Sequence, residues 1–139
     1  MTVWISTAAR LERNRLSETQ RRDCKIVVRT VSGETGVRYC DFFASSRMRL
    51  HTAGARQLAM YLCHVLLGMT MTQVGQFFGR DRTTVAYACA HVEDMRDEGG
   101  DYDRRLVDLE ERIDAARRTP CALEITMQEA SHALSLIHI

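Results

Sequence analysis

Two apolar segments with helical spacing meet at residues 79–85, Gly79-Arg80-Asp81-Arg82-Thr83-Thr84-Val85. Gly79 is suited to end the first helix, and Asp81 can accept a hydrogen bond from a backbone N–H group at the start of the second. Short hydrogen-bonding side chains then occupy the first turn of the second helix. Two helices joined by a tight glycine-containing turn form a helix-turn-helix, which presents the leading end of its second helix to the major groove of DNA. The stretch therefore predicts a DNA-binding protein rather than an enzyme.

Apolar residues recur at helical spacing along most of the chain, and strand signals are nearly absent. The predicted helices are a run capped by Ser17 and ended by Gly33 and Gly36, about 38–44, about 53–67, a short helix opened by Thr70-x-x-Gln73, the helix after Asp81, and about 102–118. Side chains expected in the core include Tyr39, Phe42, Phe43, Leu58, Tyr61, Leu62, Val65, Leu66, Val74, Phe77, Phe78, Val85, Ala88, Cys89, Val92, Met95, Leu106, Leu109 and Ile113. The predicted fold class is all-α, a multi-helix domain containing a helix-turn-helix.

The same pattern divides the chain into three parts. Residues 1–20 are polar and weakly patterned, and we expect them to form a loosely ordered N-terminal arm. Residues 21–118 carry the predicted helices and suffice for one domain. Residues 119–139 follow as a C-terminal tail with a semi-apolar end, which could bind a protein partner.

Composition narrows the class of protein. Hydrophobic residues make up 45% of the 139 residues, which is ordinary for a soluble globular protein, and no apolar run is long enough to span a membrane. The N-terminal segment lacks the apolar stretch of a secretory signal. Five cysteines never form a CxxC pair, which is typical of reduced thiols in a cytosolic protein. We therefore expect a cytoplasmic protein associated with the nucleoid, with no membrane partner.

Charge is segregated along the chain. The net charge is only +1, yet basic side chains outnumber acidic ones in residues 1–96 and the reverse holds in residues 97–139. Arginine predominates, with Lys25 the only lysine, and arginine suits bidentate contacts to phosphate or guanine. The near-neutral total leaves a second hypothesis open, a protein-interaction module that uses the acidic helix 102–118 and the tail.

Two motifs resemble a known family. They are Ala55-Arg56-Gln57-Leu58-Ala59-Met60-Tyr61-Leu62 and Phe78-Gly79-Arg80-Asp81-Arg82-Thr83-Thr84-Val85. On these motifs, residues of about 21–118 resemble the C-terminal DNA-binding domain of the bacterial chromosomal replication initiator DnaA. The resemblance implies sequence-specific binding of double-stranded DNA at sites like those of the initiator. It also implies a role as a transcriptional regulator or as a modulator of replication initiation.

The ATPase of that family is expected to be absent. The sequence contains no GxxxxGK[ST] phosphate loop, and Lys25 has no glycine near it. We therefore expect a small stand-alone protein that binds DNA without a nucleotide and without opening the duplex. No catalytic residue and no cofactor is expected.

The resemblance assigns roles to residues on both sides of the turn. The base-reading residues would be Asp81, Arg82, Thr83 and Thr84, at the start of the recognition helix. The residues that would approach the DNA backbone or the minor groove are Arg47, Arg49, Arg56, Gln57, Thr72, Arg80 and Tyr87. Each has a structural alternative, because Asp81 can act only as a helix cap and an arginine on a helix or connector can be a solvated surface charge.

Three departures from the family bear on the target sequence. Arg82 stands where the family usually has histidine, and arginine favours bidentate contact with guanine. Gly79 stands alone where two glycines are common, which shortens the turn, and Met48 occupies the place of the minor-groove arginine. These departures change the expected target more than the expectation of binding.

Two cysteine–histidine pairs suggest a metal site, Cys63-His64 and Cys89-x-His91. Residues one or two positions apart do not share a helix face, and no second pair completes a tetrahedral zinc site. A pairing of Cys63 with a distant histidine for hydrolysis lacks an accompanying oxyanion motif. Buried thiols and surface histidines are the preferred interpretation, and no metal is expected.

Overall fold

The computed structural model describes residues 15–44 and 50–118, and over these ranges it contains helices and no strand. The elements are α2 (Glu18–Thr35), the 3-10 helix η1 (Tyr39–Phe42), α3 (Leu50–Val65), α4 (Met71–Phe78), α5 (Arg82–Asp97) and α6 (Asp101–Arg118). The prediction of an all-α fold is confirmed. None of these helices is long and apolar enough to cross a lipid bilayer.

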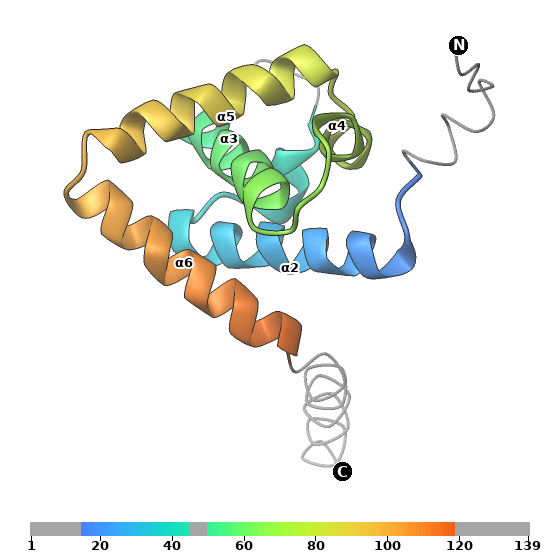
Figure 1. Cartoon of the computed structure of the whole chain (residues 1–139), viewed down its shortest axis with the longest axis horizontal. Coiled ribbons are helices and arrows are strands. Elements are labelled where there is room, and N and C mark those ends of the chain that lie inside the picture. Colours follow the sequence, from blue (N-terminus) through green and yellow to red (C-terminus); the bar gives the residue numbers. More distant parts are fainter. Residues whose placement is uncertain (1–14, 45–49, 119–139) are drawn as a thin grey trace, which may run out of the picture.

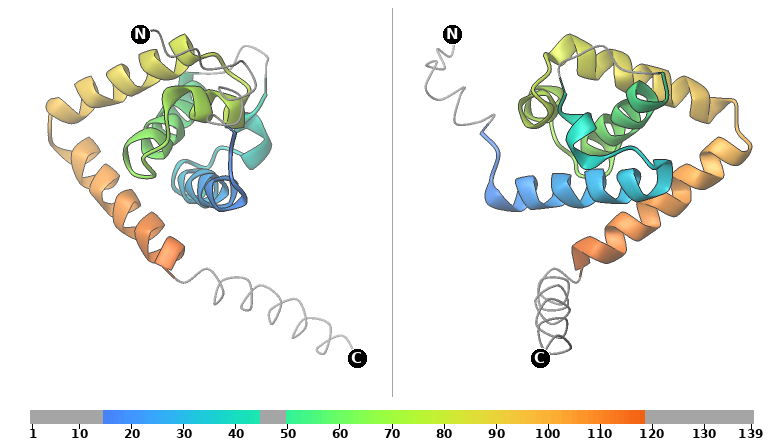
Figure 2. Two further views of the ribbon diagram at one scale, coloured as in Figure 1. Left: turned by 45° about the vertical axis from the view of Figure 1, so that its right-hand side comes forward. Right: turned by 180° about the vertical axis from the view of Figure 1, so that it is seen from behind.

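Helix α3 lies at the centre of the fold (Figure 1). It packs against α2 on one side and α5 on the other, and α4 and η1 also contact it. Every residue from Leu58 to Cys63 is buried as a result. Helix α6 turns back from the end of α5 and packs on α2, as the reverse view in Figure 2 also shows. The start of α5 therefore lies beside α4, and its end lies beside α6.

Two helix starts follow from side-chain caps that the sequence encodes. Ser17 and Gln20 form a capping box at α2, in which the Gln20 N–H donates to Ser17 Oγ at 3.1 Å. Thr70 and Gln73 form the same arrangement at α4, also at 3.1 Å. Each box satisfies N–H groups that the first helical turn leaves without an intrahelical acceptor. Both predicted capping boxes are confirmed.

Element boundaries differ from the prediction at three places. Helix α3 begins at Leu50, about three residues before its expected start. The element expected at 38–44 is a single 3-10 turn. Gly33 lies inside α2, and Gly36 ends that helix with a φ of 76°, because a lone glycine weakens a helix without stopping it.

The folded part begins inside the segment 1–20. Helix α2 starts at Glu18, and Leu16 is buried in the core just before it. The structure describes residues 15–20 as the beginning of the packed domain, whereas residues 1–14 and the tail 119–139 lie outside the described ranges.

Some side chains expected in the core are exposed or only partly buried. Val65 is 49% exposed because it is the last residue of α3, where the chain turns and carries Leu66 into partial burial instead. Tyr39 is 36% exposed and lies against Phe43, with ring centroids 5.3 Å apart. Met95 is partly buried.

Arg96 ties the end of α5 to α6. Its Nε lies 2.7 Å from Asp103 Oδ1, its Nη1 lies 2.7 Å from Glu110 Oε1, and Nη1 also donates to Tyr61 Oη at 3.1 Å. Burial alone would lower the pKa of Arg96, but the bonds to Tyr61, Asp103 and Glu110 outweigh burial and raise it. Of the apolar stripe expected on α6, Leu106, Leu109 and Ile113 are buried and Ala116 is partly buried.

Ion pairs between residues three or four positions apart join neighbouring turns of α6. Asp108 Oδ2 lies 3.1 Å from Arg112 Nε. Asp114 Oδ1 lies 3.4 Å from Nη1 of Arg117. These contacts lie on the helix surface, where ion pairs contribute little to stability.

Gly75→Ala is expected to destabilise the fold by about 1–3 kcal/mol. Gly75 lies in α4, and a Cβ there would be 2.5 Å from the backbone carbonyl oxygen of Arg80, which cannot move without shifting the turn into α5. The free energy of unfolding in urea measures the effect. Gly33→Ala is the matched control, because its Cβ would meet nothing within 4 Å, and it should stabilise α2 by up to about 1 kcal/mol. Equal effects of the two substitutions would contradict the close approach at Gly75.

Candidate nucleic-acid interface

A three-residue turn, residues 79–81, joins α4 to α5. Gly79 ends α4 in the left-handed region with a φ of 68°, which is costly for other residues. The Arg80 N–H then donates to the Gly75 carbonyl at 2.8 Å. Helices α4 and α5 pack directly on each other. The predicted helix-turn-helix is therefore present.

Asp81 caps α5 with its side chain. Its Oδ1 accepts the Thr84 N–H at 2.8 Å. This bond, with smaller contributions from the Thr84 hydroxyl and the Thr83 N–H, lowers the pKa of Asp81. An ionised carboxylate has about four acceptor positions, so capping leaves capacity for a donor outside the protein.

The four residues expected to read bases lie together and face solvent. Asp81, Arg82, Thr83 and Thr84 are all exposed. Helix α6, which carries much of the acidic charge, packs at the opposite end of α5 and leaves this end uncovered (Figure 1). Within the described ranges, Arg82 makes no hydrogen bond or ion pair. Its guanidinium is therefore available to a ligand.

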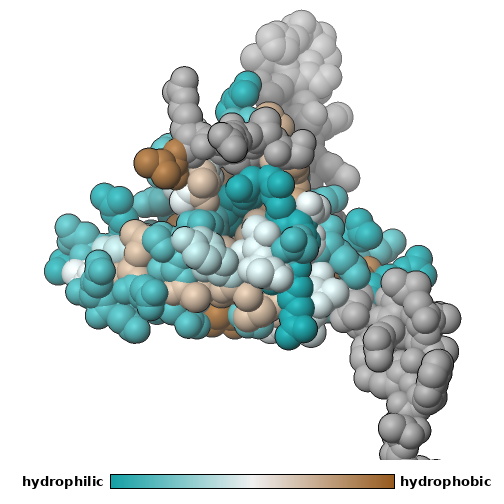
Figure 3. Space-filling model, turned by 90° about the horizontal axis from the view of Figure 1, so that it is seen from above, coloured by the Kyte–Doolittle hydropathy of each residue, from teal (hydrophilic) through white to brown (hydrophobic). Residues whose placement is uncertain are grey.

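The outer face of α5 continues this polar surface. Figure 3, viewed from the α5 side, shows mostly hydrophilic residues with scattered apolar ones. Tyr87 is 67% exposed, and its ring stacks on that of His91 with centroids 6.3 Å apart and an angle of 3°. Sequence reasoning missed His91 as a surface neighbour of Tyr87, although their i,i+4 spacing places them on one helix face.

Thr72 lies in the first turn of α4. The capping box engages the N–H groups of Thr70 and Gln73, whereas helical geometry gives those of Met71 and Thr72 no intrahelical acceptor. A helix start of this kind suits an anion such as a phosphate. The position of Thr72 is therefore compatible with the predicted contact to the DNA backbone.

The side chains of Arg56 and Arg80 meet at one backbone carbonyl, a contact that the sequence did not indicate. Arg80 Nη2 donates a hydrogen bond to the backbone carbonyl of Ala44, and Arg56 Nη1 donates to the same carbonyl at 3.5 Å. Burial, followed by the nearby charge of Arg80, lowers the pKa of Arg56. Both arginines are partly buried. Contacts within the protein therefore hold at least part of both guanidinium groups.

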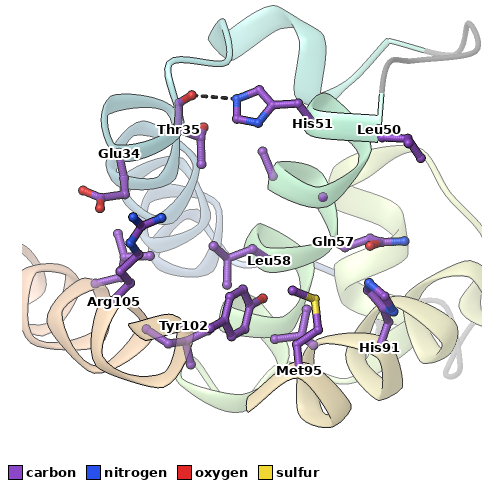
Figure 4. Close-up of a pocket in the computed structure, with 15 residues that line it drawn as sticks. Glu34, Thr35, Leu50, His51, Gln57, Leu58, His91, Met95, Tyr102 and Arg105 are labelled. Atoms are coloured by element: carbon purple, nitrogen blue, oxygen red, sulfur yellow. Dashed lines mark hydrogen bonds between the residues drawn. The ribbon is translucent and has the colours of Figure 1, made fainter. Parts of the chain in front are cut away.

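Gln57 lies on the α5 side of a cavity of about 290 Å³ between α2, α3, α5 and α6 (Figure 4). His91 and Met95 of α5 line the same cavity, and Tyr102 of α6 closes it from below in that view. His51 Nε2 and the Thr35 carbonyl oxygen, 2.8 Å apart, join α3 to α2 at its edge. Gln57 is partly buried and lines the cavity from α3, near His91 of α5.

The remaining predicted residues lie outside the described ranges. Arg47 and Arg49 belong to residues 45–49, between η1 and α3, and so does Met48. The described residues on either side are Ala44 and Leu50, and Leu50 is 93% exposed.

Among the described residues, no three His, Cys, Asp or Glu side chains come together in a way that could hold a metal ion. Cys63 is buried in the core, and burial raises the pKa of its thiol. His64 directs Nδ1 toward the Met69 carbonyl oxygen at 2.7 Å. The core-thiol interpretation of Cys63 matches this environment.

Comparison with known proteins identifies the domain. Residues 24–92 match the model of the bacterial DnaA protein helix-turn-helix. These residues are a DnaA helix-turn-helix domain. The match runs from α2 to the end of the buried face of α5, and it includes every predicted contact residue.

Individual relatives agree with this assignment. The chromosomal replication initiator protein DnaA of Rippkaea orientalis is 32% identical over 96 residues, which is 68% of this chain and 21% of that protein. DnaA of Leifsonia xyli is 39% identical over 74 residues, 52% of this chain and 15% of that protein. A solved structure described as a DNA replication initiation factor superposes with a TM-score of 0.61 at 26% identity, covering 76% of this chain and 31% of that one. The chain thus spans about a fifth or less of the length of these two curated DnaA proteins.

Asp81→Asn should lower the stability of the DnaA domain at neutral pH, and its difference from the wild type should fade in acid. Asparagine can still cap a helix but brings no charge to its positive end. Because folding lowers the pKa of Asp81, its contribution is complete above the unfolded-state pKa and is lost as the pH falls through the folded-state pKa.

Urea unfolding of both proteins between neutral pH and about pH 2 tests this dependence. Glu111→Gln, which removes an exposed carboxylate in the middle of α6, serves as the control. A difference between wild type and Asp81→Asn that stays constant to the lowest pH would contradict the role of the charge.

Proposed function

We propose that this protein binds double-stranded DNA sequence-specifically through the leading end of α5, and that it acts as a transcriptional regulator or a modulator of replication initiation. The observation that carries the proposal is the exposed cluster Asp81–Thr84 at the start of α5. The similarity to proteins named chromosomal replication initiator supports the same function. Binding needs no nucleotide or cofactor, and the protein is not an enzyme.

The geometry suits entry of α5 into the major groove with its N-terminal end first. Arg82 has the reach and planar donors to bind guanine O6 and N7, and the Thr83 methyl group suits contact with a thymine methyl group. The free acceptor positions of Asp81 suit a cytosine amino group. Target sites similar to those of the initiator, but with guanine opposite Arg82, are the expected ligands.

Contacts with the DNA backbone would fix the register of α5. The N–H groups of Met71 and Thr72 at the start of α4 have no intrahelical acceptor, and Tyr87 is exposed farther along α5. Arg56 and Gln57 of α3 would add contacts from a third element. Arg47 and Arg49 would reach the minor groove from residues 45–49. The protein would act in the cytoplasm, at the nucleoid.

The alternative function, a protein-interaction module that uses the acidic helix 102–118 and the tail, gains no support from α6, and the tail lies outside the described residues. The apolar stripe of α6 is buried, and its Asp103 and Glu110 bind Arg96 of α5. Helix α6 therefore completes the fold and balances charge inside it.

Selection of bound duplexes from a random pool by the purified protein tests the proposed function. We expect enrichment of one short motif containing a guanine that depends on Arg82. A pool that remains random after repeated rounds would contradict sequence-specific binding.

The affinity of the protein for the selected duplex should fall steeply with salt. The logarithm of the binding constant is expected to decrease linearly with the logarithm of salt concentration, with a slope of about 0.9 for each phosphate neutralised. Fluorescence anisotropy at several salt concentrations measures the slope. A binding constant that does not change with salt concentration would contradict an interface that binds DNA phosphates, despite the basic side chains around α5.

Arg82→Ala should weaken binding to the selected duplex by about 1–3 kcal/mol and relax the preference at one base pair. The reason is the loss of a bidentate contact to guanine. Arg104→Ala is the matched control, because Arg104 is an exposed arginine at the other end of the molecule, on α6. If Arg82→Ala instead weakens binding to all DNA sequences equally, Arg82 is a phosphate ligand.

A further inference from the structure

The cavity that Gln57 and Tyr102 line is enclosed by a ring of helices (Figure 4). Helix α2 packs on α3, α3 on α5, α5 on α6 and α6 on α2, so each helix contacts its neighbours on both sides in the ring. Protein interiors are packed as densely as organic crystals and rarely leave a space larger than a water molecule. A cavity of about 290 Å³ therefore has room for a molecule much larger than water.

Polar contacts between the helices hold this ring in place. Glu34 Oε2 of α2 lies 2.8 Å from Arg112 Nη2 of α6. The ion pairs of Arg96 join α5 to α6, and His51 Nε2 joins α3 to the Thr35 carbonyl oxygen of α2. The remaining side of the ring is the packing of α3 on α5. The cavity is therefore a preformed part of the fold, as binding sites for small molecules usually are.

The wall of the cavity is mainly apolar. Leu58 of α3, Met95 of α5 and Leu106 and Leu109 of α6 line it, and the ring of Tyr102 points into it (Figure 4). Pockets that bind small molecules combine such a wall with a few polar groups that orient the ligand. Burial of an apolar ligand body against these side chains would contribute favourably to binding, because it removes apolar surface from water.

The polar groups on the lining favour an anion. Arg105 of α6 lies on the α2 side of the cavity (Figure 4). It is exposed and makes no hydrogen bond or ion pair within residues 15–44 and 50–118. His51 and His91 add imidazole rings from α3 and α5. Glu34 is the only carboxylate among the described lining residues, and Arg112 neutralises it. A carboxylate that entered the cavity would thus meet a guanidinium without a partner.

We propose that the cavity binds a small monocarboxylic acid with an apolar body, whose carboxylate pairs with Arg105 and whose body lies between Leu58 and Tyr102. The charged pair orients the ligand, and the apolar wall supplies the contact area. This binding goes beyond the proposed function and does not depend on it. The residues expected to read bases, 81–84, line no part of the cavity, so ligand binding is measurable in the free protein.

Titration of the free, full-length protein with phenylpropionate, followed by amide NMR, tests the site. We expect saturable shifts for the amides of Gly54, Gln57 and Tyr102, with a dissociation constant in the millimolar range or tighter. Phenylpropanamide, which has the same body without the charge, should bind about tenfold more weakly, the loss expected for one charge-assisted hydrogen bond. The absence of saturable shifts, or shifts confined to residues outside the lining, would overturn the proposal. Equal affinity for the amide would overturn the assignment of a carboxylate ligand.

Substitution of Arg105 separates the charge from the cavity. Arg105→Gln should weaken phenylpropionate binding about tenfold and leave phenylpropanamide binding unchanged. Arg104→Gln is the matched control, because Arg104 is the exposed neighbouring arginine and does not line the cavity. It should leave the affinity for both probes unchanged. Equal affinities of wild type and Arg105→Gln for phenylpropionate would overturn the proposal.

A second variant fills the cavity instead of changing its charge. Gly54 of α3 lines the cavity, and a Cβ there would meet nothing within 4 Å. Gly54→Leu therefore has room for its side chain, and its unfolding temperature should not fall, because leucine favours a helix more than glycine does. It should weaken the binding of both probes. Unchanged affinities in this variant would overturn the location of the ligand in the cavity.

Discussion

The orientation of α5 depends on the contact between Gly75 and the backbone of Arg80. The absence of a side chain at Gly75 lets the turn lie directly on α4, and the hydrogen bond from the Arg80 N–H to the Gly75 carbonyl holds it there at 2.8 Å. Since α4 packs on α3 and buries Val74 and Phe78 in the core, the direction in which α5 leaves the turn is determined. The Asp81 cap then decides where the first turn of α5 begins, and so which side chains point away from the protein. A small displacement at Gly75 would therefore be carried to the whole exposed end of α5.

The parts of this fold that local chemistry determines could be predicted from the sequence. Both capping boxes, the glycine ends at Gly36 and Gly79, and the Asp81 cap involve residues no more than five positions apart. The apolar faces of α5 and α6 were also predicted, because helical periodicity fixes which side chains share a face. Errors occurred where a helix end meets its neighbours, as at Val65 and Leu50. There, burial depends on the path of the following or preceding chain rather than on periodicity.

The candidate site likewise has a part that local sequence predicts and a part that depends on packing between distant elements. The cluster Asp81–Thr84 could be located because a cap and a first turn are local features. The convergence of Arg56 and Arg80 on Ala44 could not, since it joins three elements that are distant in sequence. From the sequence alone, an arginine beside a turn is interpreted as a solvated charge or a phosphate ligand, because the packing around it is not known. The i,i+4 pair of Tyr87 and His91 was within reach of sequence reasoning, but neither residue carried a strong signal by itself.

The arrangement of α6 bears on how a chain with a net charge of only +1 could bind a polyanion. Acidic residues in the last third of the described chain would oppose DNA binding if they surrounded the start of α5. Instead, Asp103 and Glu110 bind Arg96 at the far end of that helix, and Asp108 binds Arg112 on the surface of α6. Screening in physiological salt reduces interactions beyond about 8 Å, and α5 is about 24 Å long, so these charges act weakly on its leading end. The local charge around Arg82, rather than the charge of the whole chain, is thus what an approaching phosphate would meet.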